Sequence, residues 1–172
     1  IADSPRELPE ASLRDLLQRL AGEGEDQEAV LVPRIGVLVA RAGSVVDERR
    51  LETARRLLSE GLLSALQLHG DESPEECALF GTPYYKALRP RDLAELVQAE
   101  GYRRPRLLLD GYSAARYGGT GSSVAEEIID RWREKKPLWL AGGIKPENVA
   151  ERIRRFSPEL IDVASGVEAA PG

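Results

Sequence analysis

The chain reads LWLAGGI at residues 138–144 and LIDVASGV at residues 160–167, and these two stretches decide the fold class. Each begins as a short apolar run, which is typical of a strand buried on both faces, and each then passes into small residues. An amphipathic stretch of helical length separates the two. A strand, a small-residue turn, a helix and a second strand of the same kind predict a parallel α/β fold.

The same alternation runs along the whole chain. Six segments are predicted to be strands: residues 34–40, 65–70, 84–89, 106–110, 138–141 and 160–164. Two architectures fit this series, a doubly wound open sheet and a (βα)8 TIM barrel that is incomplete, with about six strands present. Because glycine and polar residues recur after several strands, and residues 40–43 (ARAG) make a poor phosphate turn, the barrel is favoured.

Helix signals lie between the predicted strands. The spacing of a buried helix face is followed by Leu13, Leu16, Leu17 and Leu20. Ser73 with Glu76, and Ser123 with Glu126, have the spacing of a capping box, and Pro74 suits a first helical position. These residues predict where two further helices begin.

Composition limits the classes of function. With 172 residues, 42% of them hydrophobic, the chain has material for one substantial core, so a single domain is expected. Its net charge of −5 argues against a nucleic-acid partner, and no apolar run is long enough for a membrane helix. The one cysteine, Cys77, excludes an internal disulfide and a cysteine-based zinc cluster and fits a reducing, cytoplasmic setting. The chain begins at Ile1 and contains no methionine, which suggests that upstream residues are missing.

The small residues after the last two predicted strands are candidates for binding phosphate. Gly142 and Gly143 follow one strand, and Ser165 and Gly166 follow the next. Such turns let backbone N–H groups approach an anion, and barrels often build a phosphate site from their last two loops. Taken singly, each turn is explained equally well by a tight change of direction.

Asp110 ends the apolar run of residues 107–109, at the mouth of a buried strand. A partly desolvated carboxyl group there is suited to act as a general acid, although a turn or helix-capping aspartate fits the position at least as well. Residues 117–121 (YGGTG), with Gly118 and Gly119, could then form a loop over a ligand.

Four other residues need an interpretation. His69, the only histidine, closes a predicted strand, and we expect it to line the site, since no second histidine or cysteine makes a metal pair. Lys86 and Arg89 are compatible with the mouth, the interior or the rim of a barrel. Cys77 lies in a predicted helix, where a buried packing thiol is the favoured interpretation.

Several segments together resemble phosphoribosylanthranilate isomerase of tryptophan biosynthesis. They are QLHG at 67–70, LLD at 108–110, YGGTG at 117–121, LAGGIKPENV at 140–149, DVASGVE at 162–168 and SPR at 4–6. The resemblance implies an Amadori rearrangement of N-(5-phosphoribosyl)anthranilate, an aminoaldose, to an aminoketose, with neither cofactor nor metal. Asp110 would be the general acid and Arg6 would hold the anthranilate carboxylate. The other substrate-binding residues implied are Gln67, His69, Gly118, Gly119, Gly142, Gly143, Ser165 and Gly166.

The resemblance also marks what this chain lacks. The family's general base is a cysteine in a Lys-Ile-Cys-Gly-like motif on the first strand, and no such motif occurs here. We therefore expect a barrel over residues 1–172 that is truncated at both ends, and little or no turnover by this chain alone. As alternatives we retain a non-catalytic remnant that binds a phosphorylated ligand, or another sugar-phosphate barrel enzyme such as indoleglycerol-phosphate synthase. A monomer or homodimer is expected.

Overall fold

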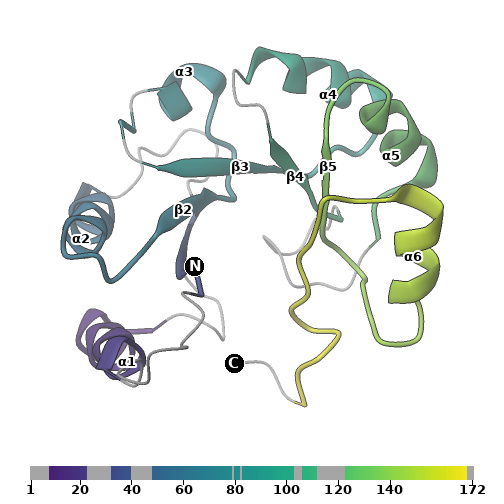
Figure 1. Ribbon diagram of the computed structural model, residues 1–172. Coiled ribbons are helices and arrows are strands. Elements are labelled where there is room, and N and C mark those ends of the chain that lie inside the picture. Colours follow the sequence, from purple (N-terminus) through teal and green to yellow (C-terminus); the bar gives the residue numbers. More distant parts are fainter. Residues whose placement is uncertain are drawn as a thin grey trace. The chain divides into compact units, whose positions relative to one another are not determined.

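The computed structural model of the chain describes residues 8–22, 32–39, 48–78, 80–81, 83–102, 106–111 and 123–169 (Figure 1). These residues belong to two compact units. The first unit comprises residues 1–72 and 80–84, and the second comprises residues 73–79 and 85–172.

Strands and helices alternate in the first unit. Its elements are α1 (Glu10–Gly22), β1 (Ile35–Leu38), α2 (Glu48–Ser59) and β2 (Ala65–Leu68). β1 and β2 are parallel, with Ile35 opposite Ala65 and Leu38 opposite Leu68.

An apolar core holds the helices of the first unit to its strands. Leu17 of α1 and Leu57 of α2 are buried in one cluster with Leu66 of β2. Glu10 and Arg56 form an ion pair between the two helices. Of the four leucines predicted to share the buried face of α1, Leu17 is buried, whereas Leu20 is 50% exposed because it lies close to the end of the helix.

The second unit continues the alternation. Its elements are α3 (Pro74–Ala78), β3 (Tyr84–Leu88, whose first residue is counted with the first unit), α4 (Leu93–Gln98), the 3-10 turn η1 (Ala99–Gly101), β4 (Leu107–Leu109), α5 (Glu126–Arg133), β5 (Leu138–Leu140), α6 (Val149–Phe156) and β6 (Leu160–Ile161). β3 pairs with β4, β4 with β5 and β5 with β6, all in parallel. All six predicted strands are therefore present, each within its predicted segment, and the α/β class is confirmed.

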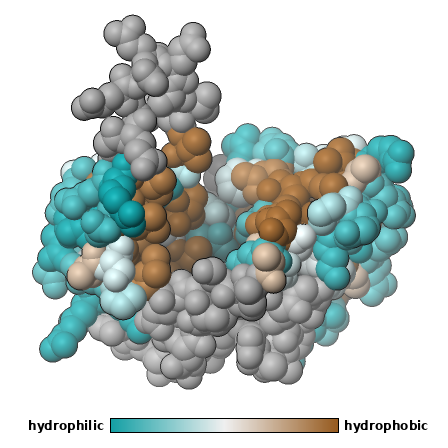
Figure 2. Space-filling view, turned by 90° about the horizontal axis from the view of Figure 1, so that it is seen from below, coloured by the Kyte–Doolittle hydropathy of each residue, from teal (hydrophilic) through white to brown (hydrophobic). Residues whose placement is uncertain are grey.

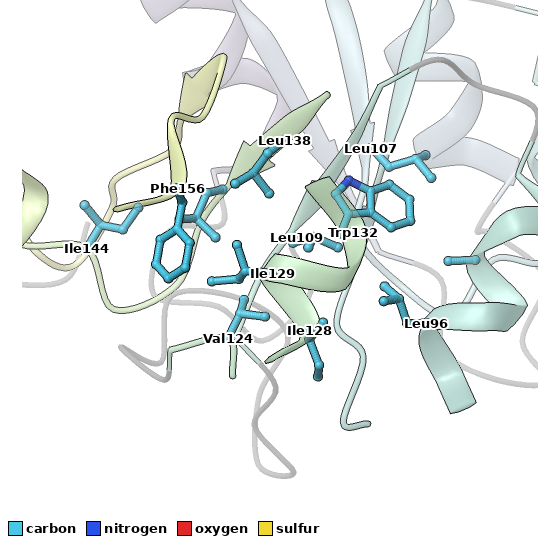
Figure 3. Close-up of a cluster of buried hydrophobic side chains, with 12 residues drawn as sticks. Leu96, Leu107, Leu109, Val124, Ile128, Ile129, Trp132, Leu138, Ile144 and Phe156 are labelled. Atoms are coloured by element: carbon cyan, nitrogen blue, oxygen red, sulfur yellow. The ribbon is translucent and has the colours of Figure 1, made fainter. Parts of the chain in front are cut away.

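The core of the second unit lies between its strands and its helices. Figure 3 shows Trp132 of α5 beside Leu107 and Leu109 of β4, and Ile128 and Ile129 of the same helix belong to the same buried cluster. Each of these side chains is at most 2% exposed. Burial of such large side chains stabilises a fold by about 1.5–3 kcal/mol each, so this layer fixes the strands that carry the site.

The first residues of α3 and α5 can be compared with the two predicted capping boxes. Ser73 accepts from the Glu76 amide at 3.2 Å, and the Glu76 carboxylate accepts from the Ser73 amide at 2.7 Å, so the first capping box is confirmed. The second is wrong. α5 begins after Ala125, whose carbonyl accepts from the amides of Ile128 and Ile129, and no side chain caps the helix.

Hydrophobic residues also reach the surface, as the brown atoms of Figure 2 show. Nine large apolar side chains of the described residues are exposed: Leu8, Leu20, Val32, Ile35, Leu93, Val97, Ile153, Leu160 and Val167. Among the helices described, none has the length and apolar character needed to cross a membrane.

Candidate active site

Asp110 directly follows β4 and is held in place by two hydrogen bonds. Its amide donates to the carbonyl of Leu88 at 2.8 Å, and its Oδ1 accepts from the amide of Gly111 at 2.8 Å. The residue is only 5% exposed. This position at the carboxyl end of a buried parallel strand is where α/β proteins place catalytic groups. The bond to Gly111 also gives the carboxylate a structural part in the turn.

Glycine is required in the turn after β5. Gly142 and Gly143 have φ angles of 84° and 64°, in the left-handed region that residues with a side chain rarely adopt. Asn148 spans the turn, because its Nδ2 donates to the Gly143 carbonyl at 2.8 Å and its Oδ1 accepts from the Lys145 amide at 2.9 Å. The sequence signal for the role of Asn148 was available, since asparagine commonly bonds to backbone groups in turns.

The turn after β6 lies against the turn after β5. A Cβ atom on Gly166 would stand 1.9 Å from the carbonyl oxygen of Ile144, far inside van der Waals contact. Ser165 is exposed beside it, and the Val167 amide closes the turn by donating to the Ala164 carbonyl at 3.1 Å. The structure thus brings together the two small-residue turns that the sequence predicted to cooperate.

Gln67 and His69 belong to the first unit, at the end of β2. Both are buried, at 5% and 4% exposure, and the Gln67 Nε2 donates to the His69 Nδ1 at 2.5 Å. The His69 amide donates to the Leu38 carbonyl at 2.8 Å. Nearby, the buried Glu72 accepts from the Gly70 amide at 3.0 Å. His69 is therefore a well-bonded residue at a strand end, as expected for a lone histidine.

The structure also places the remaining candidates. Lys86 points to the helix side of β3, where its Nζ donates to the Ala87 carbonyl at 2.6 Å and stands 6.0 Å from the Tyr102 ring centroid. It is buried on this side of the strand and not on the face opposite the helices, so the barrel-interior interpretation is wrong. Cys77 is 1% exposed within α3, which confirms a packing thiol. Arg6, Gly118 and Gly119 lie outside the described residues.

An aromatic pair and an aspartate, which sequence reasoning did not single out, lie on the face of the sheet opposite the helices. The rings of Tyr85 and Trp139 meet edge to face with centroids 5.2 Å apart. Burial, together with the negative charge of Asp162, raises the pKa of Tyr85 to about 12. The available signal was strand alternation, which puts these residues on one face.

Comparisons with known proteins agree on one family. Residues 34–172 match the family described as N-(5'-phosphoribosyl)anthranilate (PRA) isomerase. The chain is 39% identical over 170 residues to N-(5'-phosphoribosyl)anthranilate isomerase of Syntrophus aciditrophicus, covering 98% of this chain and 67% of that protein. Neither alternative, the non-catalytic remnant or indoleglycerol-phosphate synthase, is favoured by these matches.

Solved structures give the same result. Phosphoribosyl anthranilate isomerase from Thermotoga maritima superposes with a TM-score of 0.77 at 31% identity, covering 99% of this chain and 76% of that one. A structure of a phosphoribosyl anthranilate isomerase in complex with reduced 1-(o-carboxyphenylamino)-1-deoxyribulose 5-phosphate matches with a TM-score of 0.71 at 29% identity. It covers 99% of this chain and 75% of that one.

Proposed function

The chain belongs to the N-(5'-phosphoribosyl)anthranilate isomerase family, and from this membership we propose how its residues serve the isomerisation in tryptophan biosynthesis. The substrate is N-(5-phosphoribosyl)anthranilate, and the product is 1-(2-carboxyphenylamino)-1-deoxyribulose 5-phosphate. The observation that carries the proposal is the placement of Asp110 and of two contacting small-residue turns after β4, β5 and β6. The isomerisation needs a general acid, and the phosphate group of the substrate needs an anion-binding site.

Asp110 is proposed as the general acid. It donates a proton to the furanose ring oxygen as the bond between that oxygen and C1 breaks, and the nitrogen lone pair forms a C=N bond to C1. Loss of the C2 proton to a base then gives an enol, which becomes the ketone of the product. The position of Asp110 suits this role, because it is buried directly after a parallel strand, where α/β proteins place catalytic groups.

The phosphate is proposed to bind at Gly142, Gly143, Ser165 and Gly166. Support comes from the contact between Gly166 and the Ile144 backbone, which brings the two small-residue turns side by side. Asn148 fixes the first turn through its two hydrogen bonds, so the backbone is organised before a ligand arrives.

The other substrate contacts are extended from the family resemblance. Arg6 is proposed to hold the anthranilate carboxylate, and Gly118 and Gly119 to lie over the substrate. Gln67 and His69 are proposed to line the site from the end of β2. The hydrogen bond between their side chains orients the imidazole, since an amide nitrogen can only donate and leaves the ring proton on Nε2.

The base is proposed to be absent from these residues. Cys77 is buried inside α3 and so cannot take a proton from a bound substrate. This chain spans 67% and 76% of the two relatives reported first, and no Lys-Ile-Cys-Gly-like motif occurs in it. We therefore expect the 172-residue chain by itself to turn over little or nothing.

The architecture and setting complete the proposal. A (βα)8 barrel formed as one domain, of which residues 1–172 are part, is supported by the superposition on the Thermotoga maritima enzyme. A cytoplasmic location is supported by the single, buried cysteine. A monomer or homodimer, acting without cofactor or metal on a phosphorylated small molecule, remains our prediction.

The test is fluorescence-followed consumption of N-(5-phosphoribosyl)anthranilate by the full-length gene product. Asp110→Asn should lower kcat by roughly 10²- to 10⁴-fold, because the amide fills the same volume but cannot donate an acidic proton. Asp15→Asn, a matched change at an exposed position of α1, should leave turnover unchanged. A folded full-length protein without turnover would refute the activity, and an active Asp110→Asn variant would refute the acid.

A further inference from the structure

Arg89 and Asp110 are neighbours, since each is the residue that directly follows its strand. Leu88, the last residue of β3, is opposite Leu109, the last residue of β4. The Asp110 amide continues the ladder by donating to the Leu88 carbonyl at 2.8 Å. Because Pro90 follows Arg89, the backbone of Arg89 is restricted to an extended conformation, which continues the strand. The backbones of Arg89 and Asp110 are therefore about 5 Å apart, the ordinary spacing of neighbouring strands.

The side chains of Arg89 and Asp110 point away from the helices. Leu88 and Leu109 pack in the buried cluster that also contains residues of α4, α5 and α6. Successive residues of an extended chain point to opposite faces of a sheet. Arg89 and Asp110 therefore share the other face, the one that carries no helix in this cluster.

An apolar layer lies beneath the two charged residues on that face. Ala87 and Leu108, two residues before Arg89 and Asp110, are buried there in a cluster with Ala141. A guanidinium turned down onto this layer would lose its water and find only hydrocarbon. Arg89, which is partly exposed, is therefore expected to extend towards the strand ends, where a ligand can reach it.

The order of these groups along the sheet matches the order of the groups in the substrate. The two turns proposed for the phosphate follow β5 and β6, Asp110 follows β4 and Arg89 follows β3. These four strands are successive neighbours. In N-(5-phosphoribosyl)anthranilate the phosphate is at one end, the ring oxygen is in the middle and the anthranilate carboxylate is at the other end. A substrate with its phosphate in the turns and its ring oxygen at Asp110 has its aromatic end on the side of β3.

We propose that Arg89 contacts the carboxylate of the anthranilate group, as a second cation alongside Arg6. A guanidinium presents two parallel N–H donors, which match the two oxygens of a carboxylate. This carboxylate distinguishes the substrate from other sugar phosphates, so Arg89 contributes to substrate selection. The inference rests on the proposed function and extends it to this residue.

Calorimetric titration of the full-length protein with two ligands tests the contact. The first ligand is the reaction product, 1-(2-carboxyphenylamino)-1-deoxyribulose 5-phosphate, and the second is 1-phenylamino-1-deoxyribulose 5-phosphate, which lacks the carboxylate. Arg89→Gln should weaken binding of the first ligand about 10- to 100-fold, because a hydrogen-bonded pair of charges is lost, and leave the second within about twofold. Arg89→Lys keeps the charge but not the paired donors, so its affinity for the first ligand should lie between those of wild-type protein and Arg89→Gln.

Arg91→Gln is the matched control. Arg91 also lies shortly after β3, but its guanidinium pairs with Glu95 in the first turn of α4, and its side chain is 60% exposed. The substitution removes the same charge from the same part of the chain, so an effect of net charge alone would appear here as well. Arg91→Gln should leave both affinities at their wild-type values.

Turnover separates a substrate contact from an effect on the neighbouring acid. Loss of a contact that is equally strong in the bound substrate and in the transition state raises KM and leaves kcat nearly unchanged. Arg89→Gln should therefore raise KM for N-(5-phosphoribosyl)anthranilate about 10-fold or more and keep kcat within about threefold. If Arg89 acts through Asp110 instead, kcat falls and its pH dependence shifts, while the ratio of the two affinities stays at its wild-type value. That result overturns the inference.

The remaining outcomes distinguish the inference from the proposed function. If Arg89→Gln and Arg89→Lys weaken both ligands equally, or if neither ligand is affected, the inference is overturned while an active wild-type enzyme keeps the function. An equal loss in Arg91→Gln also overturns the inference. If Arg89→Gln does not fold, Arg89→Lys decides by the same comparison. A wild-type protein that binds the carboxylated ligand through Arg89 but does not turn over supports the inference and refutes the function.

Discussion

The turns after β5 and β6 and the segment after β2 end parallel strands in different ways. In the second unit the ends are shaped by backbone, with Gly142 and Gly143 at positive φ and Gly166 against a carbonyl oxygen. In the first unit the end is shaped by buried polar side chains, with Gln67 bonded to His69 and Glu72 bonded to the Gly70 amide. The first construction depends on backbone conformation and close backbone contact, and the second fixes the orientation of a side chain.

This difference predicts how each region responds to substitution. A backbone-built turn tolerates no added atom, because a carbonyl oxygen cannot move without moving the strand behind it. A side-chain network loses a defined hydrogen bond when one member is removed, and the rest of the chain can stay in place. A substitution that adds a side chain in the second unit should therefore lower the free energy of unfolding more than one that deletes a hydrogen bond in the first unit.

Gly166→Ala should have the largest effect. Its methyl group would stand 1.9 Å from the Ile144 carbonyl oxygen, so the two turns must separate. We expect the free energy of unfolding to fall by about 3 kcal/mol, the upper part of the range for overpacking, and inorganic phosphate binding to be lost. Urea unfolding and calorimetric titration measure the two effects.

Gly61→Ala is the matched control for this variant. Gly61 has a φ of 71°, but nothing lies within 4 Å of an added Cβ. Gly61→Ala should lower the free energy of unfolding by only about 1–2 kcal/mol, because of the left-handed backbone alone, and should leave phosphate binding intact. If Gly166→Ala is no worse than Gly61→Ala, the two turns are not in the contact described.

Gln67→Leu should be next in size. The substitution removes the donor to the buried His69 Nδ1, and deleting one partner of a buried hydrogen bond costs about 1–3 kcal/mol. Urea unfolding followed by circular dichroism should therefore show a loss of about 2 kcal/mol. Adding His69→Leu completes a double-mutant cycle, and a coupling energy below about 0.5 kcal/mol would show that the bond contributes little.

The same variant asks whether the two units unfold together. Both tryptophans of the chain, Trp132 and Trp139, belong to the second unit, so their fluorescence reports on that unit alone. Since we propose one domain, Gln67→Leu in the first unit should shift the fluorescence midpoint as much as the circular dichroism midpoint. A shift seen by circular dichroism only would mean that the units unfold separately.

Asn148→Ala should have a smaller effect than either substitution. It removes the bonds to the Lys145 amide and the Gly143 carbonyl, in a part of the turn that solvent reaches and can partly replace. The expected loss is about 1–1.5 kcal/mol, with phosphate binding weakened severalfold because the turn is less well organised. Asn148→Asp keeps the acceptor for the Lys145 amide and loses the donor for the Gly143 carbonyl. Its stability and phosphate affinity should lie between those of wild-type protein and Asn148→Ala. Unchanged phosphate affinity in both variants would separate Asn148 from the anion site.

Apolar runs located the strands because a strand buried on both faces must be almost continuously hydrophobic, as residues 107–109 are. The Ser73 capping box was readable because both of its members lie within one turn of chain. The Ser123 box failed because the N-cap of α5 is Ala125, so Ser123 lies two residues before the cap and Glu126 is the first helical residue rather than the third. Local patterns therefore predicted elements well and their first residues less well.

Long-range contacts were harder to predict. Glycines after β5 and β6 indicated an anion site, yet only the structure places the Gly166 backbone on Ile144, since sequence spacing gives no distance between loops. Asp162 was quoted only as part of the segment 162–168 and was given no role of its own. Its place near Tyr85 follows from strand register, which single-strand patterns do not specify.

Tyr85 should report the smallest effect, as a spectroscopic shift. Burial first, and then the charge of Asp162, raise its pKa to about 12, above the ordinary value of 10.0. Between about pH 10 and pH 12 the unfolded chain loses this proton and the folded chain keeps it, so stability falls as pH rises through that window. Tyrosinate absorbance, taken as the difference between wild-type protein and Tyr85→Phe, should show almost no ionisation of Tyr85 at about pH 10. Asp162→Asn should lower the pKa of Tyr85, because the negative charge is removed while burial remains. An unchanged titration would mean that the Asp162 carboxylate does not face the ring.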